Sequence, residues 1–376
     1  MSKNNRGPEP SNLTIHMLCA RAAGRCQFIG CNKYLFKDEI TLNDFNNTNV
    51  AHIVASSPDG PRGDPIRSHE LSNKIENLML MCFDHHKLID SMPQKFTEES
   101  LLAMKAQQEQ EVHDACEMMY KEGTEIVRFF SPIKGKIEVN ISFADAAKAV
   151  KNEKKLLNME GITIDPKSSE SYRSKQYWKE VASQLEDGVN CYIRSMLRIH
   201  PGTHMSIFPL APIPLIIKFG YLLGDKMQLA IYQKTRTPDT WNWITKELTN
   251  HFYIEQKVKI KKAQKVAFIM SLTANISEDR ISEVFQADAI YCIRAKKLGV
   301  DCIQSIEDLS QFWHVYQEVC DQIRNDYGKD CEVAVFPAIP VSAAFEVGRR
   351  YMPGVYPKLK IYDECGGFFE TLTIGE

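Results

Sequence analysis

Short apolar runs rich in β-branched and aromatic residues alternate with longer amphipathic patterns along the second half of the sequence. The β-like runs are Met205–Phe208, Met227–Tyr232, Val266–Leu272, Ala289–Ile293 and Val333–Phe336. Apolar residues recur at helical spacing over Ile306–Asn325 and Val341–Tyr351. This alternation predicts an α/β fold with a mostly parallel sheet. The strand–loop–helix segments after the third and fifth runs are similar to each other, which suggests a build of two lobes.

The first part of the chain has a different pattern. Residues 1–90 contain few long periodic segments and are dense in Cys, His, Asn and Gly. From Glu98 to Glu122 the pattern is helical and charged, which predicts a solvated helix leaving the first module. We therefore expect a two-domain protein of the α+β or α/β class. Its parts would be a first domain over 1–124, a connector over 125–170 and a second domain over 171–376.

The composition, 44% hydrophobic and 25% charged, excludes a disordered or fibrous chain. With 46 Lys and Arg against 48 Asp and Glu, no overall field draws the chain to nucleic acid or an anionic membrane. The longest apolar stretch, residues 207–223, is interrupted by prolines and Lys218, so we expect no membrane span. The polar N-terminus has no signal-peptide core. The 11 cysteines are therefore expected to be thiols and metal ligands in the cytoplasm.

Four residues have the spacing of zinc ligands. Cys26 and Cys31 flank a knuckle in which Gly30 permits a turn, and Cys82 and His85 follow some fifty residues later. Zinc takes four ligands at tetrahedral corners, usually as close pairs from separate loops. The spacing predicts a structural Zn²⁺ site.

A second set of polar residues lies among these ligands. His52 stands in a β-like run, Asn77 stands shortly before Cys82, and His86 directly follows His85. A helix that starts at residue 83 or 84 would place the two adjacent histidines about 100° apart around its axis. One ring could then face the zinc while the other faces a second metal ion.

The order of His52, Asn77 and His86 on strand, strand and helix resembles the ββα-metal motif of HNH endonucleases over roughly residues 15–95. The resemblance implies hydrolysis of phosphodiester bonds. His52 would be the general base that deprotonates water, and His86 would bind Mg²⁺ or a similar divalent ion on the scissile phosphate. Asn77 would pin the loop between the strands and orient the base or the metal. A neutral imidazole near pH 7 suits the first role.

One position departs from that family. Many HNH nucleases carry Asp immediately before the base histidine, as a metal ligand, whereas this chain has Ala51. Asp64, Asn73 and Asn77 are alternative ligands, among which the sequence does not choose. Arg62 and Arg67, in the same loop, could instead clamp a phosphate. Residues 1–90 hold ten Lys and Arg and ten Asp and Glu, so the module has no broad basic footprint and should bind DNA weakly when alone.

The segment VAVFPAIPVSAAFEVGRRYMPGVYPKLKIYD predicts a strand, a proline-bounded loop, a helix that Ser342 can cap, and a further strand. Helix N-termini bind phosphate groups, and ligands of open α/β sheets lie at the carboxyl ends of strands. With the upstream strands MQLAIYQ and VAFIMSLT, this segment resembles the SAVED sensor domains, which are related to the CARF nucleotide sensors of CRISPR systems. The resemblance implies an α/β domain of two CARF-like, Rossmann-like lobes.

Phosphates bind Lys, Arg and helix N-termini, and bases stack on aromatic faces. On this basis the expected ligand contacts are Lys234, Arg236, Trp241, Trp243, Ser271, Thr273, Pro337, Ile339 and Ser342. Trp313 and Tyr316 lie at helical spacing and are interpreted as core. Arg349 and Arg350 are interpreted as a solvated helix face or a subunit contact.

An HNH nuclease joined to a SAVED sensor is similar to effectors of cyclic-oligonucleotide-based antiphage signalling (CBASS) in bacteria. The resemblance implies an endonuclease activated by a cyclic di- or trinucleotide, with a cyclic GMP-AMP isomer favoured. It would degrade double-stranded DNA with little sequence preference, as a dimer or tetramer of this chain and without a membrane. Two other interpretations remain open. The chain could be a restriction-type HNH nuclease that senses modified DNA, or a non-catalytic, zinc-stabilised DNA-binding protein controlled by a ligand.

Overall fold

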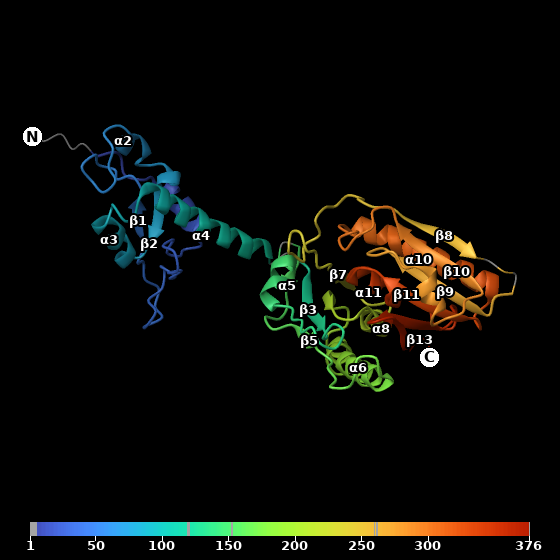
Figure 1. The fold of residues 1–376 in the computed structure, drawn as a ribbon. Helices are drawn as coiled ribbons and strands as arrows, with labels where there is room; N and C mark the ends of the chain where they lie inside the picture. The colour runs from blue at the N-terminus through green and yellow to red at the C-terminus, as the bar shows by residue number, and fades with distance from the viewer. Residues whose placement is uncertain (1–5, 119–120, 152, 259, 261, 376) are drawn as a thin grey trace, which may run out of the picture. The chain divides into compact units, whose positions relative to one another are not determined.

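The structure, a computed structural model, describes residues 6–118, 121–151, 153–258, 260 and 262–375 (Figure 1). It divides into two compact units, an N-terminal unit over Met1–Lys121 and a C-terminal unit over Glu122–Glu376. Each unit buries a hydrophobic core of its own. Among the described helices, none combines the length and the apolar character that crossing a membrane would require.

The N-terminal unit is built around one short hairpin and the helices beside it. Its elements are α1 (Asn12–Arg21), β1 (Asn49–His52), α2 (Arg67–Leu71), the 3₁₀ helix η1 (Ile75–Asn77), β2 (Leu78–Met81), α3 (Phe83–Ser91) and α4 (Glu98–Met118). β1 and β2 pair antiparallel, with His52 opposite Leu78. All four residues of β2 are buried, so this strand is the centre of the unit's core.

Helix α4 is more than the solvated helix that its charge pattern predicts. Leu101 is fully buried in the core of the N-terminal unit. The amide of Gln108 donates to the carbonyl oxygen of Ala22 at 3.1 Å and accepts from the amide of Gln27 at 3.1 Å. Gln27 also holds β2, because its side-chain oxygen accepts from the backbone N–H of Leu80 at 2.8 Å. Buried amides that all find partners fix this helix to the hairpin.

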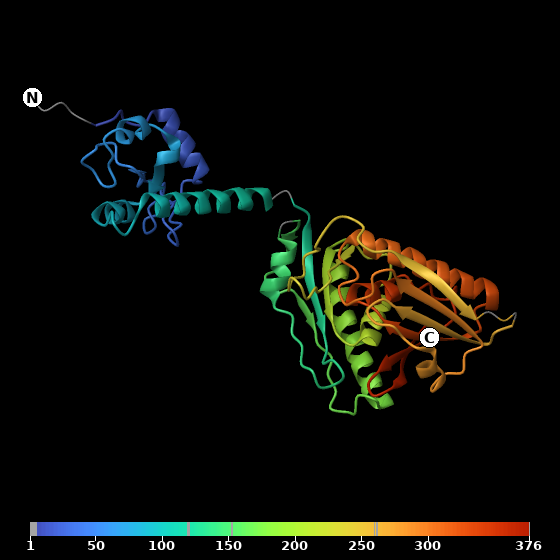
Figure 2. The same cartoon turned by 45° about the horizontal axis from the view of Figure 1, so that its top comes forward.

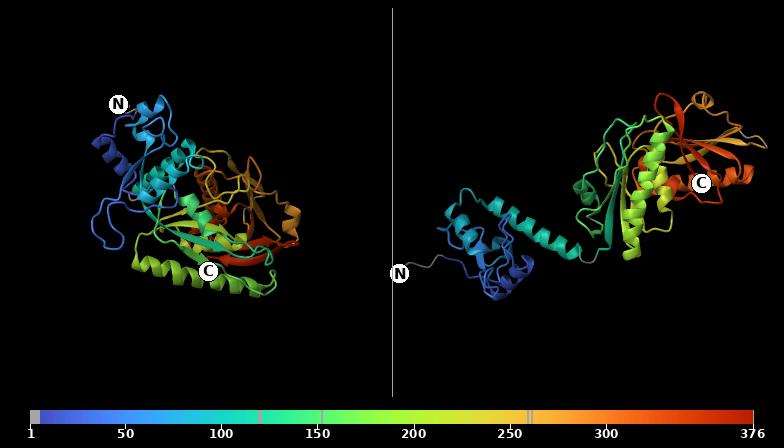
Figure 3. Two further views of the ribbon diagram at one scale, coloured as in Figure 1. Left: turned by 90° about the vertical axis from the view of Figure 1, so that its left-hand side faces the viewer. Right: turned by 90° about the horizontal axis from the view of Figure 1, so that it is seen from below.

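The first lobe of the C-terminal unit contains a parallel five-stranded sheet in the order β4-β3-β6-β7, with β5 also paired to β3. Its elements are β3 (Gly123–Phe130), α5 (Phe143–Val150), β4 (Lys155–Leu156), β5 (Ile162–Ile164), α6 (Lys175–Gly188), η2 (Val189–Arg194), α7 (Ser195–Ile199), β6 (His204–Leu210), α8 (Ile213–Leu223) and β7 (Leu229–Ile231). The continuous helix formed by α6, η2 and α7 lies beside this sheet (Figure 3).

The structure differs from the predicted connector over 125–170, because residues from β3 to β5 are an integral part of the C-terminal unit. β3 forms a central strand and pairs along its whole length with β6, Thr124 with His204 through Phe130 with Leu210. That partner comes some eighty residues later in the chain. A strand with so distant a partner carries little local signal, and the boundary at residues 121 and 122 follows from tertiary pairing.

The second lobe contains a six-stranded sheet in the order β13-β12-β11-β9-β10-β8, with parallel inner strands and antiparallel edges. Its elements are β8 (Phe252–Val258), β9 (Lys265–Ser271), α9 (Glu278–Ser282), β10 (Ala289–Ala295), α10 (Ile306–Tyr327), β11 (Glu332–Ala338), α11 (Val341–Arg349), β12 (Leu359–Glu364) and β13 (Phe368–Ile374). Helix α10 lies along one face of this sheet (Figure 2). All five β-like runs predicted in the sequence form strands, which confirms the predicted α/β class for this unit.

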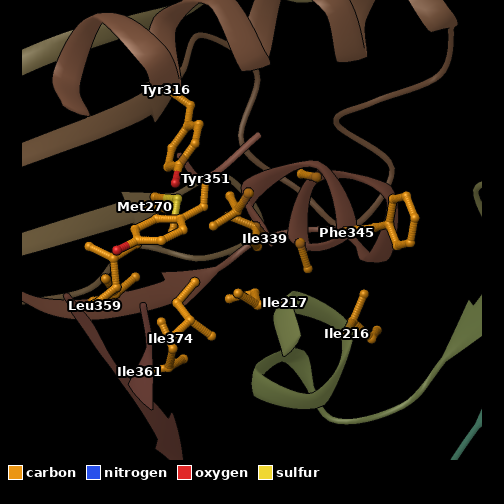
Figure 4. Packing of buried hydrophobic residues seen from close by; sticks show 14 of the residues in the cluster. Ile216, Ile217, Met270, Tyr316, Ile339, Phe345, Tyr351, Leu359, Ile361 and Ile374 are labelled. Atoms are coloured by element: carbon orange, nitrogen blue, oxygen red, sulfur yellow. The ribbon is translucent and has the colours of Figure 1, made fainter. Parts of the chain in front are cut away.

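The two lobes share one core, centred on α8 and α11 (Figure 4). Each helix follows a strand of its own lobe, and each carries a glycine as its eighth residue, Gly220 in α8 and Gly348 in α11. A methyl group at Gly220 would collide with the carbonyl oxygen of Phe345, and one at Gly348 with that of Ile217. The backbones of α8 and α11 can approach closely only because both positions are glycine.

The two lobes are present, but the two strand–loop–helix segments from which they were predicted are not the ones that correspond. β9 and β11 belong to the same sheet, and β9 is followed only by the short helix α9. The corresponding segments are β6–α8 and β11–α11. Each strand carries Phe-Pro just before its last residue, at Phe208 and Phe336, and each helix starts directly after a proline.

Candidate functional site

The predicted zinc ligands come together in the N-terminal unit. One ligand atom from each of Cys26, Cys31, Cys82 and His85 lies within 4.8 Å of all the others. The first pair stands on the knuckle, where Gly30 has a φ of +78° that suits glycine. The second pair stands at the start of α3, with Cys82 as the residue before its first turn.

The distances within this cluster fit ligands arranged tetrahedrally around one metal ion. The Sγ atoms of Cys26 and Cys82 are 3.8 Å apart, and the Nδ1 atom of His85 is 3.7 Å from the first and 3.2 Å from the second. Two sulfur ligands at ~2.3 Å from zinc would be separated by ~3.8 Å. Burial raises the pKa of the Cys26 thiol to about 12, so a thiolate there needs a cation beside it. The donor set and its geometry therefore suit Zn²⁺.

His52 and His86 line one cavity of about 620 Å³. His52 is the last residue of β1, and His86 lies in the first half of α3, next to the zinc-cluster residue His85. The structure therefore gives the doubled histidine the geometry that the helix period predicts, with one ring in the metal cluster and the other in the cavity.

The ring of His52 is oriented by the backbone. Its Nε2 atom lies 3.0 Å from the carbonyl oxygen of Ser72, which can only accept a hydrogen bond. Nε2 is therefore the protonated nitrogen, and in the neutral ring Nδ1 is free to accept a proton. Burial lowers the pKa of His52 below its ordinary value, with Arg6 and His86 acting in the same direction. The neutral form is favoured at pH 7.

Asn77 is buried and acts on the backbone. Its side-chain oxygen accepts from the N–H of Val54 at 2.8 Å, and its amide donates to the carbonyl oxygens of Val54 at 2.9 Å and Leu71 at 3.3 Å. These bonds tie the loop after β1 to the segment before β2. They hold His52 at its place without putting the amide of Asn77 into the cavity, whose lining residues do not include it.

Asp90 is a cavity residue that the sequence reading missed. Its Oδ2 atom lies 3.4 Å from Nε2 of His86, four residues earlier on α3. Its Oδ1 accepts a hydrogen bond from the guanidinium of Arg62 at 3.0 Å. An imidazole nitrogen and a carboxylate oxygen at this separation can be neighbouring ligands of one divalent ion. The i, i+4 spacing of His86 and Asp90 on a predicted helix was the signal that could have found them.

The proposed substitutes for the missing Asp at Ala51 lie elsewhere. Asp64 binds the backbone just before and at the start of α2, with Oδ1 accepting from the N–H groups of Ile66 and Arg67 at 2.9 and 2.8 Å. Asn73 bonds the start of α1 through the N–H of Ser11 at 2.8 Å. Neither residue lines the cavity.

The predicted phosphate clamp is also corrected. Arg62 is 7% exposed in its side chain, because its guanidinium donates to the carbonyl oxygens of Ile53 and Ile89 at 2.7 and 2.8 Å. Arg67 pairs with Glu98. The arginine that lines the cavity is Arg6, half exposed, bonded to Ser56 Oγ at 2.9 Å and paired with the exposed Glu9 at 3.0 Å.

In the C-terminal unit, the loops that follow β9 and β11 lie side by side. The backbone N–H groups of Leu272 and Thr273 donate to the carbonyl oxygen of Ala338 at 2.9 and 2.8 Å. This brings the predicted ligand residues Ser271, Thr273, Pro337, Ile339 and Ser342 to one edge of the sheet. Thr273 and Pro337 are half-buried there. Ser271 is buried with its hydroxyl accepting from the N–H of Ile276, and Ile339 is in the core, so neither faces a ligand.

Ser342 does not cap α11, since Pro340 precedes the first turn and Ser342 is the second helical residue. Its N–H donates to the side-chain oxygen of Gln233 at 3.1 Å, and its buried hydroxyl has no partner among the described residues. Gln233, two residues after the end of β7, thus joins the two lobes at this helix N-terminus. It was not predicted from the sequence.

The segment after β7 contains two tryptophans that were predicted as base contacts, and the structure buries one of them more fully than the other. Trp241 is 4% exposed and packs edge-to-face on Phe208 with ring centroids 5.2 Å apart, so it is a core residue and no platform for a base. Lys234 pairs with Asp239 beside it, and Arg236 is exposed. Trp243 is half-buried and lines a cavity of about 260 Å³ between β7, α10 and α11.

That cavity is also lined by Trp313, Arg349 and Arg350, which the sequence did not assign to a ligand site. Trp313 is half-buried in its wall, with the guanidinium carbon of Arg350 4.5 Å from its ring centroid. Arg349 and Arg350 both bond the buried carboxylate of Glu346, at 3.0 and 2.8 Å. The Arg350 guanidinium is therefore held over the Trp313 indole, and Arg349 and Trp243 line the same cavity. They do not form the solvated helix face that was expected.

Comparisons with known proteins bear on the C-terminal unit. No curated protein matches the chain. Similar solved structures include the Acinetobacter baumannii Cap4 SAVED/CARF-domain containing receptor with the cyclic trinucleotide 2'3'3'-cAAA, at 11% identity and a TM-score of 0.43, covering 78% of this chain and 60% of that one. The Moraxella osloensis Cap4 receptor has 10% identity and a TM-score of 0.38, covering 77% of this chain and 60% of that one. This chain thus spans about three fifths of the length of these receptors.

One family model matches within the chain. Residues 192–374 match the SMODS-associated and fused to various effectors sensor domain, abbreviated SAVED. The matched segment runs from η2 through β13 and includes the α8–α11 core and both loops described above. This match confirms the prediction of a SAVED-like sensor domain in the C-terminal half of the chain.

Proposed function

We propose that this chain is a metal-dependent DNA endonuclease that a cyclic oligonucleotide activates, an effector of bacterial antiphage defence. The observation that carries the nuclease is the shared cavity of His52, His86 and Asp90. The SAVED-like segment supports the sensor. Double-stranded DNA would be the substrate, cut with little sequence preference.

In this proposal His52 is the general base. Its Nδ1 atom accepts a proton from a water molecule, while the Nε2–H bond to Ser72 keeps the ring in place. The water oxygen forms a bond to phosphorus, and the bond from phosphorus to the leaving sugar oxygen breaks. Arg6, at the rim of the same cavity, would bind a phosphate oxygen as a cation. Asn77 would be a positioning residue, acting through the loop that it ties down.

His86 and Asp90 would hold the divalent ion, such as Mg²⁺, with water completing its coordination. When bound, such an ion neutralises charge on the phosphate and on the leaving oxygen. The paired Arg62 keeps one oxygen of Asp90 occupied and the other directed toward His86. Zn²⁺ on the Cys26 cluster would be structural, since four protein ligands leave no open position for substrate.

The ligand would be a cyclic di- or trinucleotide, and a cyclic GMP-AMP isomer remains the favoured candidate. The solved Cap4 receptors include complexes with cyclic trinucleotides. Three groups support phosphate and base contacts in this chain: the α11 N-terminus beside Thr273 and the free Ser342 hydroxyl, the exposed Arg236, and the Trp243 cavity with Arg349 and Arg350.

Assembly into dimers or tetramers of this chain would couple ligand binding in the C-terminal unit to DNA cleavage in the N-terminal unit. Residues 1–90 carry equal numbers of acidic and basic residues, so one N-terminal unit holds DNA weakly. Several units on one duplex would gain affinity by avidity. The ligand must then bind the assembled state better than the free chain.

A plasmid-degradation assay with Mg²⁺ and a panel of cyclic di- and trinucleotides tests the proposal. We expect degradation only with one or a few of these nucleotides, and its loss in His52→Ala, with zinc content and ligand affinity retained. Degradation that depends on base modification instead would support the restriction-type alternative. Degradation that persists in His52→Ala would show that His52 is not the general base. A ligand-dependent mobility shift without cleavage would favour the non-catalytic DNA-binding protein.

A further inference from the structure

Glu125 is a buried acid that neither proposed site uses. It lies on β3, where alternate residues face the same side of the sheet. The next two residues on that side, Val127 and Phe129, are buried in the shared core with α6 and η2. Glu125 is 6% exposed, and its Oε1 atom has no hydrogen-bond partner among the described residues.

This carboxyl group lines a cavity of about 740 Å³ within the first lobe. Apolar walls come from Leu157, Ile162, Met196 and Ile199, and polar groups come from Asn158, Ser195, His200 and Thr203. Tyr192 and Cys191 enter from η2, the π-helical turn between α6 and α7 that lies beside the sheet (Figure 3). Irregular turns of this kind are frequent at functional sites.

The cavity is separate from the sensor edge of the unit. Glu125 is the third residue of β3, and His200 and Thr203 directly precede β6, so the cavity lies at the amino ends of these strands. Thr273 and Ser342 follow the carboxyl ends of β9 and β11, where ligands of open α/β sheets bind. A ligand here would be distinct from a cyclic nucleotide at that edge.

A buried acid without a partner destabilises a fold, and a leucine would suit its neighbours better. Burial raises the pKa of the Glu125 carboxyl above its ordinary range, with no cation among the causes. Glu125 is the only acidic residue that lines the cavity, and neither Lys nor Arg is among the lining residues. The lining thus offers Glu125 no Lys or Arg as a counter-ion, and His200, which also lines the cavity, makes no hydrogen bond with its Oε1 atom among the described residues.

We propose that this cavity binds a small organic cation, an apolar body that ends in a protonated amine, with the Glu125 carboxylate as its counter-ion. The apolar body would pack on Leu157, Met196 and Ile199, and the ammonium group would bond Oε1 of Glu125. The proton of the acid leaves to solvent when the ammonium group binds. A volume of about 740 Å³ lies within the range of small-molecule sites.

Three indole derivatives that share the apolar ring and differ in the charge of their terminal group test whether the cavity prefers a cation. Calorimetric titration of the full chain with tryptamine, tryptophol and indole-3-propionate should give affinities in that order, because only the first carries an ammonium group. Glu125→Gln should weaken tryptamine by at least roughly tenfold and leave tryptophol within about twofold. Glu370→Gln, the same change at an exposed carboxylate on β13, is the matched control and should change neither.

Thermal melts give a second readout that a purely structural role would not produce. Glu125→Leu should raise the melting temperature of the C-terminal unit and abolish the preference for tryptamine. Equal binding of tryptamine and tryptophol, or no tryptamine binding at millimolar concentration, would overturn the proposal. So would an unchanged tryptamine affinity in Glu125→Gln, or a melting temperature that falls in Glu125→Leu.

Discussion

The N-terminal and C-terminal units are held together by different means. The N-terminal unit has a small core around β2, and its knuckle and α3 meet at the Cys26–Cys31–Cys82–His85 cluster. The C-terminal unit has a continuous core that reaches across both sheets and is centred on the α8–α11 crossing. The smaller unit thus combines a small core with a candidate metal cluster, whereas the larger one relies on close backbone packing. Small domains commonly need a metal or a disulfide for this reason.

The largest effect should follow loss of the metal cluster. Cys26→Ser, or treatment with a strong chelator, should unfold the N-terminal unit, since structural zinc contributes about 10 kcal/mol or more to folding. Calorimetry should show one transition lost and that of the C-terminal unit unchanged, with zinc content measured alongside. Cys116→Ser, at an exposed cysteine outside the cluster, is the control. A Cys26→Ser protein that keeps both transitions without zinc would contradict the assignment.

The counterpart in the C-terminal unit is the helix crossing. Gly348→Ala should lower the free energy of unfolding of that unit by about 3 kcal/mol, because the methyl group must displace the backbone of α8 at Ile217. Chemical denaturation of the full chain measures this change. Gly202→Ala, where an added methyl meets nothing within 4 Å, should cost only about 1 kcal/mol from its left-handed backbone. Similar losses at the two positions would show that the crossing is not tight.

A smaller effect separates the two tryptophans after β7. Trp243→Ala should weaken binding of the activating cyclic oligonucleotide roughly tenfold, because stacking on an indole is worth about 1–3 kcal/mol. Trp241→Phe, which keeps an aromatic ring in the core beside Phe208, should leave that affinity unchanged. Calorimetric titration with the nucleotide found in the plasmid screen measures both. The reverse result would move the base contact to Trp241.

The finest test is the pH profile of cleavage. A general base must be neutral, and burial lowers the pKa of His52, so cleavage should persist to below pH 6.5 and fall as the pH drops through that lowered pKa. Arg6 and His86 lower this pKa, whereas Glu9 and the Ser72 carbonyl raise it. Arg6→Gln should therefore move the acid limb to higher pH by less than about one pH unit. The profile should be measured at saturating metal, where a limb that follows metal concentration would point to His86 instead.

Local patterns in the sequence carried much of the candidate chemistry. The C-x4-C and C-x2-H spacings each place two ligand residues on one short turn, whereas the tertiary fold brings the two pairs together within 4.8 Å. The helical period places His85 and His86 on different sides of α3, one in the metal cluster and one in the cavity. Within each pair, and between the two adjacent histidines, the residues are close in the chain, so local backbone geometry decides how they lie relative to one another.

Other features depend on contacts that no local pattern encodes. Asp64 and Asn73, which the sequence offered as metal ligands, lie outside the cavity because they bond the starts of α2 and α1. Trp241 and Trp243 are two positions apart and differ in burial. Trp241 packs on Phe208 of a distant strand, whereas Trp243 is half-buried and lines a cavity.

By itself, the sequence determined the α/β alternation of the second half, the metal-ligand spacing and the order of the two candidate sites. The tertiary structure decided that β3 is a central strand, that Gly220 and Gly348 join the lobes, and that Glu125 is buried with its Oε1 atom unbonded among the described residues. The physical reason is the range of the interactions. Helix period and turn geometry act over a few residues, whereas strand pairing and burial join residues that are many tens of positions apart, such as Thr124 and His204.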